Sequence, residues 1–197
     1  LDKEKEYVGM YLSAHPLDPY YMEVEYGCNV KLKDIKDKSN DLDKEFIFSG
    51  LVVEFIERPT RTGGQFGIMK IEDYSGSYEL RLFKDNLIKY RNYGVPGTAI
   101  IAKGAFQKRK FNNSVDFNLF NIDLLEKVQG TLIHSITITL PAKRLTEDIL
   151  EPLKSFSISS TKNKGNLFFN IYDEKSGKHV LLQSRIKMPI TLELTKY

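Results

Sequence analysis

Apolar and polar residues follow two different periods along this chain, and the period changes near residue 45. Residues 3–14 place apolar side chains at helical spacing among charges, and two prolines then end the pattern. A second short helix is expected over residues 20–26. The segment 31–45 is rich in Asp, Lys, Ser and Asn, so we interpret it as an exposed linker. Residues 1–30 are therefore expected to be a helical segment that precedes a separate domain.

Beyond the linker, β-branched and aromatic residues alternate with polar ones, and clusters of Gly, Pro and Asn interrupt them. This pattern predicts five strands, over residues 46–58, 66–73, 77–84, 98–107 and 115–125. A short helical or irregular crossing is expected over residues 85–93, between the third and fourth strands. Three strands, a crossing and two strands are the order of the five-stranded OB barrel. Residues 46–128 are thus predicted to form an OB-fold domain.

The remaining residues, 129–197, show a less regular pattern. A strand is expected over 133–140, a helix over 145–156, and a hairpin from 167–172 and 179–183. We interpret this region as a small α+β carboxy-terminal domain. The predicted fold class is therefore mainly β, an OB barrel between a short helical segment and an α+β domain.

Composition narrows the class of protein without naming a function. With 41% hydrophobic and 28% charged residues, the chain is expected to fold. The single cysteine, Cys28, excludes an internal disulfide and favours a reducing cytoplasm, and no cluster of histidines suggests structural zinc. No apolar run approaches the length of a membrane span. Because the chain starts at Leu1 without a clear helix cap, we expect it to continue a longer polypeptide.

The net charge of +3 is too small to indicate a nucleic-acid partner, but its distribution is uneven. Residues 1–45 hold seven Lys or Arg against eleven Asp or Glu, a net charge of −4. Residues 84–112 hold seven Lys or Arg against Asp85 alone, a net charge of +6. The positive charge is thus concentrated in the predicted barrel.

An OB-fold binds its ligand on the second and third strands, between the loops that join strands 1–2 and 4–5. Both loops are basic here. Single strands are held by cations along the phosphates and by rings on which bases stack. Strand alternation turns Leu80 and Leu82 inward, so the neighbouring residues face outward. The predicted nucleic-acid-binding residues are Arg58, Arg61, Phe66, Lys70, Arg81, Phe83, Lys108, Arg109, Lys110 and Phe111, with Tyr78 as a further ring.

Each of these features also has a purely structural interpretation. A triplet such as residues 108–110 in a hairpin is more often solvated than binding, and only its agreement with a second basic loop favours the interface. Single aromatic residues are more often core, and we assign Phe48, Phe55, Phe106 and Phe117 to packing.

No sequence motif in the chain indicates catalysis. A Walker loop, a Gly-x-Ser-x-Gly elbow and a Cys-x-x-Cys pair are all lacking from the sequence. Glu72 and Asp73 are adjacent and point to opposite faces of a strand, so a turn is favoured over a Mg²⁺ site. We predict that this chain is not itself an enzyme and holds neither a metal nor another cofactor.

Two motifs resemble a known family. Residues 4–20, with Gly9, Tyr11-Leu-Ser13 and His15-Pro-Leu17, resemble a signature of the bacterial DNA polymerase III alpha subunit, a C-family replicative polymerase. Residues 58–64 and 69–83 resemble that family's OB domain, although Glu72-Asp73-x-Ser75-Gly76 also occurs in anticodon-binding OB domains. The tail resembles the family's carboxy-terminal domain less closely.

This resemblance implies a place beside single-stranded template DNA, with the rest of the alpha subunit as a partner. In the family, aspartates that hold Mg²⁺ for nucleotidyl transfer and a sliding-clamp motif would precede Leu1, and the tail contacts the clamp loader's tau subunit in some members. We therefore expect a non-catalytic, cytoplasmic, single-strand-binding and replisome-assembly module. The alternatives left open are a protein-interaction platform without DNA binding and an RNA-binding OB module.

Overall fold

A computed structural model of the chain describes residues 15–61, 63–109, 114–149, 151, 153 and 164–190. The chain divides into two compact units, Leu1–Gln129 and Gly130–Tyr197. The helix expected over residues 3–14 lies outside the described residues. In the part of the chain that the structure describes, no helix is both long and apolar enough to cross a membrane.

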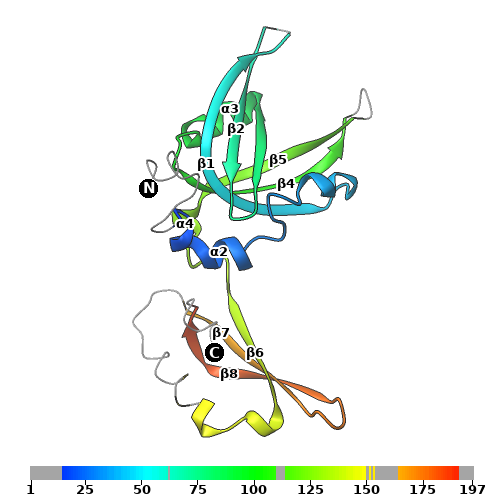
Figure 1. Cartoon of the computed structure of the whole chain (residues 1–197), viewed down its shortest axis with the longest axis vertical. Coiled ribbons are helices and arrows are strands. Elements are labelled where there is room, and N and C mark those ends of the chain that lie inside the picture. Colours follow the sequence, from blue (N-terminus) through cyan, green and yellow to red (C-terminus); the bar gives the residue numbers. More distant parts are fainter. Residues whose placement is uncertain are drawn as a thin grey trace. The chain divides into compact units, whose positions relative to one another are not determined.

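Unit 1 is built on five antiparallel strands in the order β3-β2-β1-β4-β5 (Figure 1). This is the OB arrangement, in which β1 belongs to both halves of the barrel, and the predicted fold is confirmed. A helix and a 3-10 turn join β3 to β4, as expected. The elements are β1 (Glu45–Pro59), β2 (Gln65–Glu72), β3 (Ser77–Phe83), α3 (Lys84–Tyr90), η3 (Arg91–Tyr93), β4 (Ala99–Lys108), β5 (Val115–Leu124) and α4 (Leu125–Val128).

The barrel core follows from the strict alternation of β2 and β3. Met69 and Ile71 on β2 and Leu80 and Leu82 on β3 are almost completely buried, whereas the residues between them face outward. The inward position of Gly67 is taken up by the Phe55 ring, which a Cβ at residue 67 would meet at 2.6 Å. The glycine therefore allows an aromatic ring of β1 to lie against the backbone of β2.

The segment before the barrel packs against it, which corrects one prediction. The sequence predicts an exposed linker over residues 31–45, yet Leu32 and Ile35 are buried in the barrel core. Short apolar insertions among Asp and Lys were enough to anchor the segment, although its average composition is that of a loop. The helices here are η1 (Asp18–Tyr20), α2 (Tyr21–Tyr26), where the predicted helix is confirmed, and η2 (Lys36–Asn40).

Unit 2 contains a three-stranded sheet in the order β6-β7-β8. Its strands are β6 (Ser135–Pro141), β7 (Lys164–Tyr172) and β8 (His179–Pro189), with η4 (Ala142–Arg144) after β6. The predicted hairpin of β7 and β8 is confirmed, while β6 pairs with β7 in parallel, which the sequence did not reveal. Residues 147–149, 151 and 153 are helical, and Leu153 packs with Leu167 and Met188 in a small core.

Candidate nucleic-acid interface

The β1–β2 hairpin presents two arginines at its end. The turn is closed by the Thr60 amide, which donates to the Gly64 carbonyl at 2.8 Å, and Gly63 adopts a φ of +82° that glycine accommodates without strain. Arg61 lies exposed in this turn, and Arg58 is exposed on β1 just before it. The hairpin geometry therefore holds two cations at the edge of the sheet.

Next to Arg58, two aromatic rings form a stacked pair on the outer face of the sheet. The strand register places Arg58 opposite Phe66, and Phe66 opposite Phe83. The two rings are 5.4 Å apart between centroids with planes 15° apart, and Phe83 is 41% exposed. A base can stack on such a surface while the neighbouring guanidinium contacts its phosphate. The outward orientation predicted for Phe83 is confirmed, and Phe66 faces the same way.

Arg58, Phe66 and Phe83 form one row of residues paired across β1, β2 and β3. Ile56, Ile68 and Arg81 form the next row on the same face. Arg81 is exposed, as the alternation predicts, and within the described residues it forms no ion pair. We call Arg58, Phe66, Phe83, Ile56, Ile68 and Arg81 together the platform. The two isoleucines were not among the predicted residues, although their place between outward-facing residues at 54, 58, 66 and 70 marks them as members of this face.

The third row of this face is mainly acidic. Lys70 lies between Glu54 and Glu79, and its ammonium is 3.6 Å from a carboxylate oxygen of Glu72. Lys70 faces outward as predicted, but its charge is balanced by these carboxylates. The face therefore changes from cationic and aromatic near the β1–β2 hairpin to acidic near the β2–β3 turn.

The β4–β5 hairpin supplies further cations near its end. Lys108 is exposed at the end of β4, and the Arg109 amide donates to the Ser114 carbonyl at 2.8 Å. The Arg109 side chain is paired with the carboxylate of Asp116. Lys110 and Phe111, also predicted to bind nucleic acid, lie outside the described residues.

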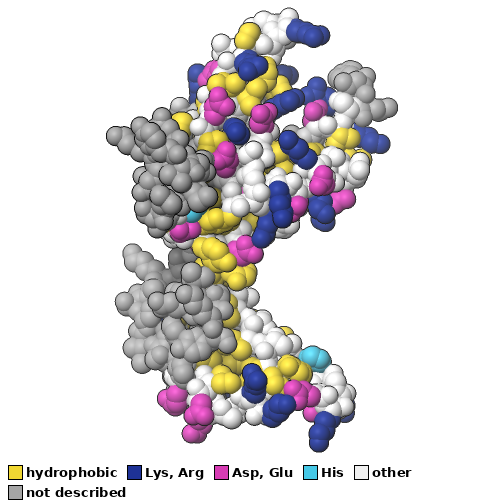
Figure 2. All heavy atoms as spheres, viewed as in Figure 1, with side chains coloured by type: hydrophobic (Ala, Val, Ile, Leu, Met, Phe, Trp, Pro, Cys, Tyr) yellow, Lys and Arg dark blue, Asp and Glu magenta, His cyan; other side chains and the backbone are white. Residues whose placement is uncertain are grey.

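Several other cations of the basic segment 84–112 are paired elsewhere. Lys103 is 2.9 Å from the Glu45 carboxylate, and Arg91 is 2.8 Å from the Glu57 carboxylate. Basic side chains gather around the ends of the two hairpins, with acidic ones among them (Figure 2). The positive charge available to a ligand is thus smaller than the net charge counted from the sequence of this segment. The fold determines which cations remain available and where they lie.

The inner rings follow the prediction except at Tyr78. Phe48 and Phe106 are buried, and Phe55 and Phe117 are partly buried against the barrel core, so their assignment to packing is confirmed. Tyr78, expected to be a stacking ring, is only 9% exposed, because it alternates inward with Leu80. Burial also raises the pKa of its phenol to about 12.

At the β2–β3 turn, Asp73 accepts hydrogen bonds rather than presenting a free carboxylate. One oxygen accepts from the Ser75 amide at 2.7 Å, the Ser75 hydroxyl at 2.6 Å and the Gly76 amide at 2.9 Å. The other accepts from the Leu32 amide at 2.9 Å. The turn interpretation of Asp73 is therefore confirmed, and no group of three or more potential metal ligands occurs in the ranges that the structure describes.

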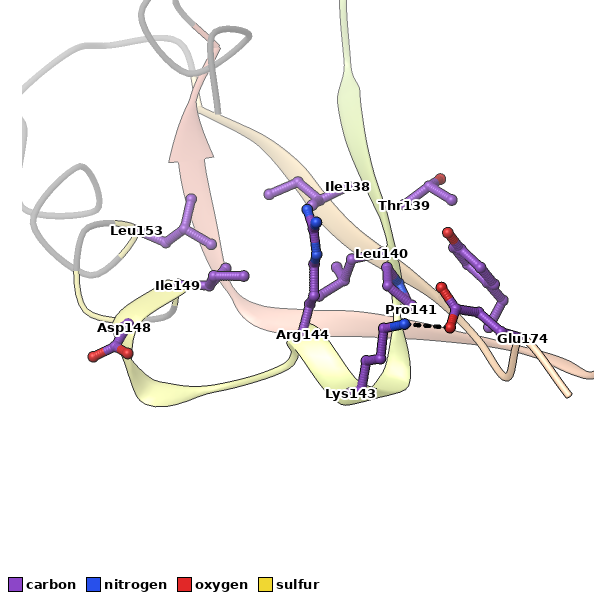
Figure 3. Close-up of a pocket in the computed structure, with 11 residues that line it drawn as sticks. Ile138, Thr139, Leu140, Pro141, Lys143, Arg144, Asp148, Ile149, Leu153 and Glu174 are labelled. Carbon is purple, nitrogen blue, oxygen red and sulfur yellow. Dashed lines mark hydrogen bonds and ion pairs between the residues drawn. The ribbon is translucent and has the colours of Figure 1, made fainter.

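Unit 2 contains a separate hollow of about 450 Å³ (Figure 3). Ile138, Leu140 and Ile149 lie around the Arg144 side chain in this hollow, and an ion pair between Lys143 and Glu174 borders it. No predicted nucleic-acid-binding residue lines this hollow.

Comparison with known proteins relates both units to one family. Residues 136–197 match the family model of the DNA polymerase III alpha subunit, C-terminal domain. The DNA polymerase III subunit alpha of Haemophilus influenzae is 26% identical over 190 residues, covering 96% of this chain and 16% of that protein. That of Borreliella burgdorferi is 28% identical over 188 residues, covering 91% of this chain and 16% of its own length.

Among solved structures, the mitochondrial single-stranded DNA binding protein Rim1 of S. cerevisiae aligns with a TM-score of 0.33 and 16% identity. The alignment covers 42% of this chain and 95% of Rim1. The chain itself spans about one-sixth of the length of the curated relatives named above. The family model and these relatives confirm the resemblance carried by the sequence motifs, and they relate the chain to the carboxy-terminal region of the bacterial DNA polymerase III alpha subunit family.

Proposed function

We propose that unit 1 binds single-stranded DNA on the platform, with the β1–β2 and β4–β5 hairpins on either side. The observation that carries this proposal is the stacked pair Phe66–Phe83 on an outward strand face. Hydrophobic rings are ordinarily buried, and Phe83 leaves 41% of its surface in water. Exposed rings beside arginines are the combination that single-strand-binding proteins use.

The arrangement of charge supports a single strand rather than a duplex-reading site. Arg58 and Arg81 occupy adjacent rows of the platform, one on each side of the β2 strand between them. They suit phosphates of a strand that crosses the strands of the sheet while its bases lie on Phe66 and Phe83. No described element of unit 1 presents a long helix of the kind that enters a DNA major groove.

Within a longer polypeptide of this family, the proposed role is non-catalytic. We propose that the polymerase activity, with the Mg²⁺ that nucleotidyl transfer uses, belongs to parts of the alpha subunit other than these residues, in the bacterial cytoplasm. The platform would hold template strand near that centre. Contacts with the sliding clamp and with the clamp loader's tau subunit are further proposals that rest on the family resemblance.

The platform can be tested by fluorescence anisotropy with a labelled oligothymidylate. Phe83→Ala should raise Kd about tenfold, because one base stack contributes about 1–3 kcal/mol. The matched control is Phe120→Ala on β5: Phe120 is 44% exposed, yet it lies outside the platform. The control should bind as the unaltered protein does. Equal losses in both variants, or no binding by the unaltered chain, would contradict the proposal.

A second candidate function concerns unit 2. Three consecutive apolar side chains of β8, Val180, Leu181 and Leu182, are 46–63% exposed. Exposed apolar residues on the edge strand of a sheet favour binding to another protein. This agrees with the protein-interaction alternative. Complex formation with the tau subunit by a chain that fails to bind DNA would favour this function. Preference for an RNA stem-loop over single-stranded DNA would instead favour the RNA-binding alternative.

A further inference from the structure

The first and last strands of the barrel order, β3 and β5, face each other across a groove. β3 pairs only with β2 and β5 only with β4 among the described strands, so both strands have one unpaired edge. Below this groove the buried ring of Tyr78 and the half-buried ring of Phe117 meet, with their centroids 6.2 Å apart. Above the rings the surface is hollowed by about 270 Å³, between Arg81 and Phe83 on one side and Val115 and Asp116 on the other.

This groove is continuous with the platform, because Arg81 and Phe83 belong to both. A strand that reaches Phe83 has two directions in which to continue. Toward the β2–β3 turn it would meet Glu54 and Glu72, which repel phosphates. Toward β5 it meets the groove, which is lined by Lys36 and Arg81 as well as by Glu79, and where the carboxylate of Asp116 is already paired with Arg109.

A further cation, Lys36, borders the groove from outside the strands. It lies at the start of η2, in the segment that packs on the barrel, and its side chain is exposed. The preceding residue, Ile35, is fully buried in the barrel core, so the backbone at Lys36 is held in place. Within the described residues Lys36 forms no ion pair, and its ammonium is available to an anion.

We propose that the nucleic-acid path continues from the platform into the β3–β5 groove, and that Lys36 binds a phosphate of the strand there. This inference rests on the proposed function and extends it to a residue that no motif of the sequence indicates. It predicts a longer footprint than the platform alone provides. A short oligonucleotide would occupy only the platform, whereas a longer one would also reach Lys36.

The neighbouring lysine offers a matched control. Lys38 lies on the same 3-10 helix and is also exposed, but it lines a different hollow, together with Asp34 and Asp37. Lys36→Ala and Lys38→Ala therefore remove the same charge from the same element. Only the first removes it from the groove, so a general electrostatic effect and a direct contact can be separated.

Anisotropy titrations with labelled oligothymidylates of about 4 and about 12 nucleotides test the inference, since OB-folds occupy sites in this range. With the longer strand, Lys36→Ala should raise Kd about three- to fivefold and reduce the salt slope by about 0.7, the value for one single-strand phosphate contact. Lys38→Ala should change neither quantity. With the shorter strand, all three proteins should bind alike.

Four results would overturn the inference. Equal affinities of Lys36→Ala and Lys38→Ala for the longer strand would remove Lys36 from the path. An equal loss with both strand lengths would place Lys36 on the platform rather than beyond it. If the longer strand binds the unaltered chain and Lys36→Ala has no effect on its Kd, DNA binds the platform but does not enter the groove. If no strand binds at all, both proposals are wrong.

Discussion

The two ends of the β2–β3 pair differ in how their polar groups are used. At the β2–β3 turn, Asp73 accepts four hydrogen bonds and Tyr74 donates its hydroxyl to Asp18 at 2.8 Å. At the opposite end, the rings of Phe66 and Phe83 stack on the outer face of the sheet, beside arginines. One end is closed by the preceding segment of the chain, and the other is free to receive a ligand.

This difference separates structural motifs from functional ones. Glu72-Asp73-x-Ser75-Gly76 is the most conspicuous motif of the barrel, and the side chains of Asp73 and Ser75 are both engaged in hydrogen bonds within unit 1. The phenylalanines of the open end belong to no motif of comparable clarity. A recognisable pattern therefore marks the turn that shapes the barrel, while the candidate interface is recognised by exposure.

The largest effect is expected at the closed end. Asp73→Ala leaves the amides of Leu32, Ser75 and Gly76 without their acceptor, so the free energy of unfolding should fall by about 3 kcal/mol. Urea denaturation followed by circular dichroism measures this change. At low temperature, the protein that remains folded should bind DNA with unchanged affinity.

Glu72→Gln is the control for this prediction, since Glu72 is the adjacent acid and its ion pair with Lys70 lies at the surface. Its effect on unfolding should stay below about 1 kcal/mol. If Asp73→Ala weakened DNA binding while leaving stability intact, the two ends would not differ in the way described.

A smaller effect is expected from cations at the open end. Arg81→Gln should reduce the slope of log Kd against log salt by about 0.7, because the strand loses one phosphate contact. Lys103→Gln is the comparison, since Lys103 is held by Glu45 at 2.9 Å. Titrations between low and moderate salt should show parallel lines for Lys103→Gln and the unaltered protein. Parallel lines for Arg81→Gln as well would exclude it from the interface.

The sequence predicts the barrel well because its determinants are local. Alternation in β2 and β3 fixes the direction of each side chain, so the inward Leu80 and Leu82 and the outward Arg81 and Phe83 could all be predicted. The crossing between β3 and β4 was marked by polar residues and by glycine and proline after it.

The sequence pattern could not predict features that depend on contacts between residues far apart in the chain. The burial of Leu32 and Ile35 depends on a surface that the barrel provides, and the parallel pairing of β6 with β7 joins strands that are far apart in the sequence. The state of each cation is equally non-local: Lys103 and Arg109 look alike in sequence, and their partners come from other strands.

The smallest predicted effect concerns the carboxylate that competes with DNA for Arg109. Asp116 pairs with Arg109 near the end of the β4–β5 hairpin and also lines the β3–β5 groove. A phosphate that binds Arg109 must displace this carboxylate and tolerate its charge. Asp116→Asn removes both obstacles, so Kd for single-stranded DNA should fall about two- to threefold, in keeping with the small free energy of an exposed ion pair.

Asp123→Asn on the same strand separates this local competition from a change in net charge. Asp123 accepts a hydrogen bond from the side-chain amide of Asn121 at 2.5 Å and does not line the groove. Both substitutions remove one negative charge, but only that at Asp116 releases Arg109. Anisotropy should therefore show tighter binding for Asp116→Asn than for Asp123→Asn. Equal gains would mean that general electrostatics control the affinity, whereas a loss at Asp116 would mean that the pair positions Arg109 for the strand instead of withholding it.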